Sequence, residues 1–322
     1  MPRKAFLPVP RAGRRYPLQA LSVLVFVAAC FLLAGCSLSL TPLAKHTAAF
    51  SSATNRVIDS STSAYRAAID LHDQEQASAG VLRVLQGDTW DPHDTKPLIS
   101  PLGMAARLKV LDALKSYAQS LSDLTSSLNS KEIDTDAAST GSGLKELSDE
   151  IVSEGGAAKF GFSLDAQGAK IVSTAAKAIG DFLVEKKIKG SVLTVTREMD
   201  PHIDALCGLL GDDVDTLRKQ SKKDYEDLLR QQMLYYRENE KQLAVSERRD
   251  EVQKLPAILK NEQSTDALLS GLQVAIRRLA LTHHALAAAA LGKDTEALNA
   301  RIADLAAAGE DLGKFYGSLP SK

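Results

Sequence analysis

Apolar residues recur at helical intervals along most of the chain. The clearest row follows intervals of four and three residues: Val110, Leu114, Tyr117, Leu121, Leu124 and Leu128. These intervals place the side chains on one face of a helix, and Pro101 suits the first turn of that helix. The pattern predicts a helix from Pro101 to about Asn129.

An earlier segment, from about Ala44 to Leu85, carries two adjacent rows at seven-residue intervals. The rows consist of Phe50, Val57, Ala64, Leu71, Ser78 and Leu85, and of Ala53, Ser60, Ala67, Gln74 and Val81. Seven-residue spacing is typical of a helix that packs along its length. We predict one helix of roughly 40 residues, about 60 Å long at ~1.5 Å per residue. Its small and polar positions allow either close helix approach or a buried groove.

Further helices are predicted in the rest of the chain. One covers residues 165–189, with an apolar face formed by Ile171, Ala175, Ile179, Phe182 and Leu183. Asp200 and Pro201 match the N-cap and the first position of the longest helix. We expect Pro256 to kink or restart the following segment. Apolar rows then predict the last two helices, over residues 267–290 and 295–316.

Residues 131–166 have a weaker pattern. The run Thr140-Gly141-Ser142-Gly143 predicts a turn, and Leu144–Ser153 predicts a short helix. Together the patterns predict an all-α fold, an elongated antiparallel bundle of about six or seven helices over residues 44–322. A subdivision of this bundle near residues 131–166 stays open.

The first 35 residues have a different pattern from the rest. Five basic residues and no acidic residue precede the end of an apolar run that begins near Ala20. A basic start, an apolar centre and a small-residue exit are typical of a secretory signal peptide. Because the run from Ala20 to Cys36 reaches the lower length limit of a bilayer span, ~17 residues, an uncleaved membrane anchor remains the alternative.

The end of this leader, Leu33-Ala34-Gly35-Cys36, resembles the lipobox of bacterial lipoproteins. The resemblance implies that a signal peptidase recognises Leu33, Ala34 and Gly35, cuts before Cys36, and leaves that cysteine acylated. Residues 36–43 then form the acylated cysteine and its tether to the membrane. Ser37 resembles the residue that sorts such proteins to the outer membrane, facing the periplasm; the outer leaflet of the inner membrane and the cell surface stay open.

Charge and cysteine content narrow the function classes. Without the leader, the remaining 34 basic and 40 acidic residues give a net charge of −6. Such a balance argues against nucleic acid as a partner, since nucleic-acid binding requires a basic face. Cys207 is then the one cysteine that carries no lipid, so the mature chain has no internal disulfide, and we interpret Cys207 as a small buried hydrophobe.

No motif for catalysis, for a cofactor or for a metal ion is present. No serine lies in a nucleophile elbow, and there is no phosphate loop or dinucleotide fingerprint. The adjacent His283 and His284 project about 100° apart on a helix, so they do not form a ligand pair on one face. We therefore predict no catalytic, cofactor-binding or metal-ligating residues, and we do not expect an enzyme.

The leading hypothesis is a lipid-anchored, periplasmic binding or scaffold protein that acts through contacts with other envelope proteins. The candidate contact residues are Trp90, His93 and Asp94 in the loop 88–97, and Arg218, Arg230 and Arg237 in the charged stretch Arg218–Lys254. The structural alternatives are that Trp90 caps the bundle and that the charged stretch is a solvated surface. In that surface Glu226–Arg230 and Asp250–Lys254 would pair at i,i+4.

Two other functions stay open. Small residues could leave a cavity for a small apolar ligand inside the bundle, and an envelope hydrolase is a further alternative. Association of the chain with copies of itself also stays open.

Overall fold

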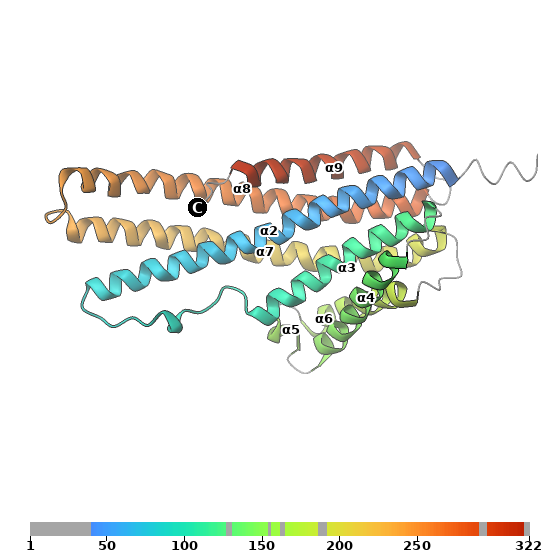
Figure 1. Cartoon of the computed structure of the whole chain (residues 1–322), viewed down its shortest axis with the longest axis horizontal. Coiled ribbons are helices and arrows are strands. Elements are labelled where there is room, and N and C mark those ends of the chain that lie inside the picture. The colour runs from blue at the N-terminus through green and yellow to red at the C-terminus, as the bar shows by residue number, and fades with distance from the viewer. Residues whose placement is uncertain are drawn as a thin grey trace, which may run out of the picture. The chain divides into compact units, whose positions relative to one another are not determined.

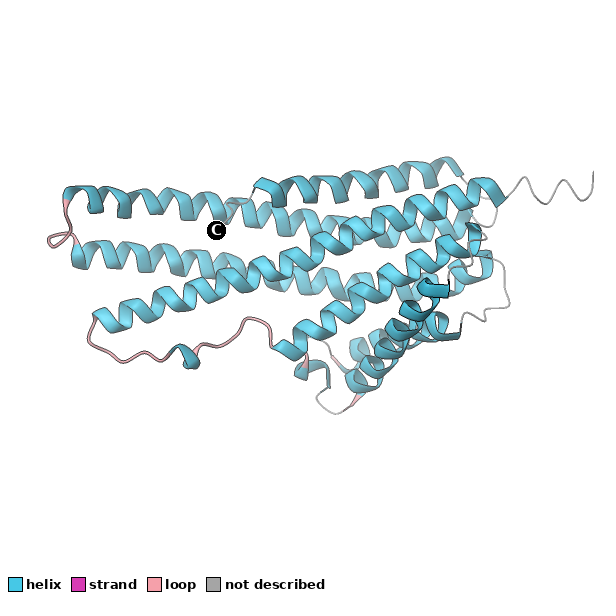
Figure 2. Cartoon of the chain, in the orientation of Figure 1, coloured by secondary structure: helices cyan, strands magenta, loops and turns pink. Residues whose placement is uncertain are grey.

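The computed structural model describes residues 40–126, 131–153, 156–161, 165–185, 192–289 and 295–318. In order, the elements are α2 (Leu40–Leu85), the 3₁₀ helix η1 (Pro92–Asp94), α3 (Pro101–Ser126), α4 (Lys131–Val152), α5 (Gly156–Lys159), α6 (Ala166–Glu185), α7 (Val192–Asn239), α8 (Val245–Ala289) and α9 (Thr295–Ser318). No strand occurs among these residues (Figures 1 and 2). The predicted all-α helical bundle is confirmed. The chain divides into two units, Met1–Pro42 and Leu43–Lys322, and the second contains the helical bundle.

Most neighbouring helices of this unit are antiparallel. Contacts between α7 and α8 run in opposite directions along the two helices, from Arg218 with Asp266 to Asp200 with His283. Helices α2 and α7 depart from this pattern: Tyr65 bonds to Asp213, and further along both helices His72 bonds to Asp224. These two long helices therefore run parallel (Figure 1), and the prediction of an antiparallel bundle holds only in part.

The first of the two seven-residue rows predicts the buried face of α2 correctly only as far as Leu71. Phe50, Val57 and Leu71 are buried, but Val81 and Leu85 are half exposed. An ideal helix drifts by roughly 20° per heptad, so a fixed seven-residue row turns away from the core after several heptads. Glu75 and Leu82 occupy the inward positions instead. The helix also begins at Leu40, inside the predicted tether.

The predicted turn at Thr140–Gly143 is wrong, because these residues lie inside α4. Gly141 allows close packing of α4 against α6. A Cβ on Gly141 would lie 2.8 Å from the carbonyl oxygen of Gly180, and a Cβ on Gly180 would lie 2.8 Å from the carbonyl oxygen of Gly141. Any side chain at either position would force the two backbones apart.

Two prolines lie within long helices rather than at their ends. Pro201 is inside α7 and Pro256 is inside α8, so Asp200 is not an N-cap and the chain does not restart at Pro256. Both rings lie on exposed positions, where water can bond the carbonyl that a proline leaves without a donor. The longest helix ends at Asn239, and the charged stretch Arg218–Lys254 is therefore a helical hairpin.

In the other helices, most of the residues predicted to face inward are buried. Val110, Leu114, Tyr117 and Leu121 of α3 belong to the core, while Leu124 and, in α6, Ile171 are half exposed. Their neighbours Thr125 and Val172 face inward instead. Cys207 is buried, as predicted, and burial raises the pKa of its thiol. None of the described helices combines the length and the apolar run that a membrane span requires.

Candidate functional site

The sequence-predicted loop residues lie at the end of α2. The indole of Trp90 packs against Gly80, where an added Cβ would collide with the ring. His93 and Asp94 belong to η1, and the Nδ1 atom of His93 lies 2.7 Å from Oδ1 of Asp91. The pKa of Asp91 is lowered mainly by the hydrogen bond from the backbone N–H of His93 and, to a smaller extent, by the bond with the His93 side chain.

The three predicted arginines differ in their surroundings. Arg218 donates to both carboxylate oxygens of Asp266, over 2.5 and 3.0 Å, which lowers the pKa of Asp266. Arg230 pairs with Asp227, so the predicted partner Glu226 is wrong. Arg237 is exposed in the last turn of α7. Lys254 likewise pairs with Glu251 rather than with Asp250.

These six residues do not form one site. The side chain of Gln86, next to the Trp90 loop, donates to Glu238 over 3.4 Å. Arg237 therefore lies at the same end of the bundle as the Trp90 loop. Arg218 lies about 28 Å away along α7, at ~1.5 Å per residue. Leu33, Ala34, Gly35 and Cys36 lie outside the described residues.

A cleft of about 370 Å³ lies between α7 and α8 beside Arg218. Its lining includes Arg218, Lys219 and Lys222 as well as Asp215, Glu262 and Asp266. A second cleft, of about 360 Å³, has mixed walls that include Gln74, Gln232 and Lys254. The charged and amide groups in these walls do not favour a small apolar ligand.

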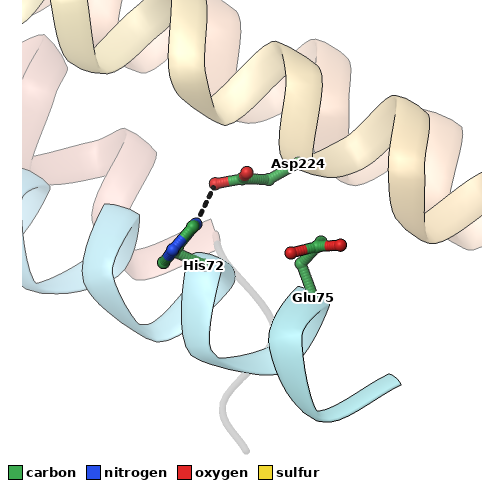
Figure 3. A group of neighbouring side chains, drawn as sticks. All are labelled: His72, Glu75 and Asp224. Carbon is green, nitrogen blue, oxygen red and sulfur yellow. Dashed lines mark hydrogen bonds and ion pairs between the residues drawn. The ribbon is translucent and has the colours of Figure 1, made fainter. Parts of the chain in front are cut away.

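A cluster of three ionisable side chains lies between the parallel helices α2 and α7. His72 and Glu75 are three residues apart in α2 and share one helix face, and Asp224 projects from α7 toward them (Figure 3). One ligand atom from each residue lies within 4.8 Å of the other two. Asp224 and Glu75 are buried, and only 12% of the His72 side chain is exposed.

Both ring nitrogens of His72 face oxygen atoms. Nδ1 lies 3.1 Å from Oδ2 of Asp224, and Nε2 lies 3.0 Å from the backbone carbonyl of Lys96. A carboxylate and a carbonyl both accept hydrogen bonds, whereas a neutral imidazole donates from only one nitrogen. This arrangement therefore requires a further positive charge, either a proton between Nδ1 and Asp224 or a cation beside Nδ1.

The two carboxylates are held by neutral amides. Gln220 donates to Oδ1 of Asp224 over 2.8 Å. Gln231 and Gln76 each donate to one oxygen of Glu75 over 2.7 Å. Gln231 is itself buried, and its Oε1 atom has no hydrogen-bond partner within the part of the chain that the structure describes. The amides orient the carboxylates but leave their negative charges in place.

A second histidine is buried in a relay that is fully partnered. Nε2 of His283 lies 2.8 Å from the hydroxyl of Tyr117, and its Nδ1 lies 2.9 Å from Oδ1 of Asp200. Burial raises the pKa of Tyr117, so its hydroxyl keeps its proton and donates to His283. Burial also acts to raise the pKa of Asp200, but hydrogen bonds from His283 and His284 outweigh it and lower that pKa. Each polar atom has a complementary partner, as in a structural network.

A third network balances its charges internally. Arg107 donates to both oxygens of Asp213, over 2.7 and 2.5 Å, and to the carbonyls of Gly103 and Phe160. The hydroxyl of Tyr65 donates to the same carboxylate over 2.6 Å. This network joins α2, α3 and α7 and leaves no charge uncompensated.

No family model matches the chain, and no curated protein and no solved structure shows significant similarity to it. The cluster of His72, Glu75 and Asp224 was not predicted from the sequence. The spacing His72-x-x-Glu75 in a predicted helix could have indicated two of its members, because residues three apart share a face.

Proposed function

We propose that this chain is a lipid-anchored protein of the bacterial cell envelope that binds other proteins through the outer end of its bundle. We define the outer end by two segments. The first is residues 81–100, which comprise the last turn of α2 and the loop that carries Trp90. The second is residues 230–260 of the α7–α8 hairpin. The resemblance of Leu33–Cys36 to a lipobox supports the anchor, and the surface of the outer end supports the binding role.

The observation that carries the binding role is a set of exposed apolar side chains at this end. They are Val81, Val84, Leu85, Met233, Val245, Val252 and Leu259. Gln232 bonds to Glu251 across the hairpin and Gln86 bonds to Glu238, so the three helices that carry these residues meet there. Apolar side chains exposed on adjoining helices are available for contact with another protein.

The charged residues of the hairpin fit the rim of such a surface. Arg237 is exposed beside the apolar positions, and Arg230 holds its guanidinium on Asp227. Arginine is enriched at protein interfaces, because it presents several donors and a planar group that packs well. Basic and acidic residues are almost equal in number at this end, so a partner with an apolar centre and a mixed-charge rim would complement it.

The contact surface is tested by photo-crosslinking in cells. A photoreactive residue at Val252, 43% exposed on α8, is compared with one at Ile171, 50% exposed on α6. We expect an adduct with one dominant envelope protein, identified by mass spectrometry, from Val252 and none from Ile171. Equal adducts from both positions, or none from Val252, would overturn the proposed surface. An adduct with a second copy of this chain would mean that the surface serves self-association and does not bind a different protein.

The anchor is tested separately by Cys36→Ser. We expect the wild-type chain to incorporate labelled fatty acid and the variant to incorporate none. Cys207→Ser is the matched control and should behave as wild type, because Cys207 is buried in the bundle. Fatty-acid labelling of the Cys36 variant would disprove the assigned acylation site.

A further inference from the structure

The cluster of His72, Glu75 and Asp224 carries an inference that is independent of the proposed function. We propose that it binds a divalent transition-metal ion of the zinc class, with Nδ1 of His72 and one oxygen each of Glu75 and Asp224 as ligands. The hydrogen-bond roles, the charge of the cluster and the groups around the ligands all favour such an ion.

The hydrogen-bond roles favour a cation beside Nδ1. When Nε2–H donates to the carbonyl of Lys96, 3.0 Å away, Nδ1 is left with a lone pair. That lone pair faces Oδ2 of Asp224 at 3.1 Å, so two electron-rich atoms confront one another. A metal ion between them resolves the conflict and uses both atoms as ligands. A backbone carbonyl on the far nitrogen is the usual way in which proteins fix the tautomer of a ligating histidine.

The charge of the cluster also favours a divalent ion over a proton. Asp224 and Glu75 are both buried, and both carry negative charge when ionised. A second proton on His72 neutralises one of them, whereas a divalent cation with a neutral imidazole neutralises both. Buried charges are strongly destabilising unless they are paired or bound to a metal. Arg107 provides this compensation for Asp213, but the amides that hold Glu75 carry no charge.

The atoms around the ligands form an outer shell. Gln220 fixes Asp224, while Gln76 and Gln231 fix Glu75, and each of these bonds orients a carboxylate. The Oε1 atom of Gln231 is a buried acceptor without a partner. Three protein ligands leave one position of a tetrahedral ion open, and a water molecule there would supply a donor for such an acceptor.

The nitrogen ligand and the spacing define the class of ion. Magnesium and calcium prefer oxygen ligands alone, whereas imidazole suits zinc and its neighbours in the first transition row. Ligands of a tetrahedral zinc ion lie about 3.4 Å apart, at metal–ligand distances of ~2.1 Å. The three ligand atoms here lie within 4.8 Å of one another. Small rotations of the two carboxylate side chains would complete the coordination.

The test uses the full chain, stripped with a chelator and titrated with Co²⁺ as a coloured substitute for Zn²⁺. We expect one Co²⁺ per chain, with visible d–d absorption that Zn²⁺ abolishes by displacement. Asp224→Asn and Glu75→Gln keep the shape of their side chains and should weaken Co²⁺ binding by more than about tenfold. Asp227→Asn, one turn further along α7 and paired with Arg230, is the matched control and should bind as wild type.

A second readout separates loss of the site from loss of the fold. Zn²⁺ should raise the thermal unfolding midpoint of the wild type and of Asp227→Asn, because an ion that binds only the folded chain stabilises it. It should leave the midpoints of Asp224→Asn and Glu75→Gln unchanged. Circular dichroism establishes that each variant remains helical, and if Asp224→Asn does not fold, Glu75→Gln decides. A wild-type chain without stoichiometric Co²⁺ binding, or equal binding by both ligand variants, would overturn the proposal.

Discussion

Two regions of the bundle bury a histidine against an aspartate, and they differ in the group that faces the second ring nitrogen. A tyrosine hydroxyl, which donates, faces Nε2 of His283. A backbone carbonyl, which only accepts, faces Nε2 of His72. His283 is therefore complete as a neutral ring, whereas His72 requires added positive charge. Both histidines have an aspartate at Nδ1, so the group that faces Nε2 is what distinguishes the structural relay of His283 from the candidate metal site of His72.

The Arg107 network and the His72 cluster also differ in how they compensate buried negative charge. Arg107 and Asp213 are both buried and oppose one another directly. Glu75 is buried in the same bundle, but among the described residues it receives hydrogen bonds from amides alone. One region therefore compensates its charges internally, and the other keeps negative charge between α2 and α7.

The largest expected effect comes from Arg107→Met. This change removes the cation and leaves Asp213 buried and uncompensated, which should lower the free energy of unfolding by about 3–5 kcal/mol. Urea unfolding followed by circular dichroism measures the loss. Glu75→Gln in the presence of a chelator is the counterpart, and it should change stability by less than about 1 kcal/mol, because it removes a buried charge that has no cationic partner among the described residues. Equal losses in the two variants would contradict the comparison.

A smaller effect is expected from Tyr117→Phe. The change leaves Nε2 of His283 buried without its donor, at a cost of about 1–3 kcal/mol in the free energy of unfolding. His284→Ala is the control: its side chain is 75% exposed although it bonds the same Asp200. Loss of that exposed pair should cost less than about 1 kcal/mol. If the two variants lose the same stability, the buried relay contributes no more than a surface ion pair.

Acidification should weaken the His283 region through Asp200. The pKa of Asp200 in the folded chain lies below its ordinary value of 3.8. The unfolded chain therefore takes up this proton first, and stability falls as the pH falls. The contribution of Asp200 to stability is fully present above pH 3.8. It is lost as the pH falls from there through the lower pKa that Asp200 has in the folded chain. In urea unfolding from pH 6 downward, the stability advantage of wild type over Asp200→Asn should shrink; an advantage that grows on acidification would reverse the sign.

The smallest effect is expected from Asp227→Asn. Asp227 lies one turn from Asp224 in α7, but its partner Arg230 is largely exposed, with 69% of its side chain accessible. Exposed pairs at i,i+3 stabilise a helix by about 0.3–0.5 kcal/mol. Thermal unfolding at low and high salt measures this difference, which should decrease as salt screens the pair. A loss above roughly 1 kcal/mol would mean that Asp227 belongs to the buried network of α7.

The helices could be predicted because periodicity is a local property. The row through Val110, Leu114 and Tyr117 defines a buried face without any knowledge of the partner helix. Gly141 could not be interpreted in the same way, because glycine suits both a turn and a close helix crossing. Only the position of Gly180, 39 residues later, distinguishes the two roles.

The candidate site depends even more strongly on long-range contacts. His72 and Glu75 share a helix face by their spacing, but Asp224 is 152 residues from His72 in sequence. The carbonyl that determines the hydrogen-bond role of His72 comes from the backbone of Lys96, and any residue type could supply it. The charge imbalance therefore appears only when three separate segments are brought together.

The parallel pairing of α2 with α7 has a consequence for the order of folding. Helices α7 and α8 are joined by a short turn and can pair as soon as both are formed, whereas parallel neighbours require a long connection between them. The contact of Tyr65 with Asp213 closes a loop of 148 residues. Closing so long a loop costs more chain entropy than closing a hairpin. We therefore expect α2 to dock after the α7–α8 hairpin, so that His72, Glu75 and Asp224 meet in a late step of folding.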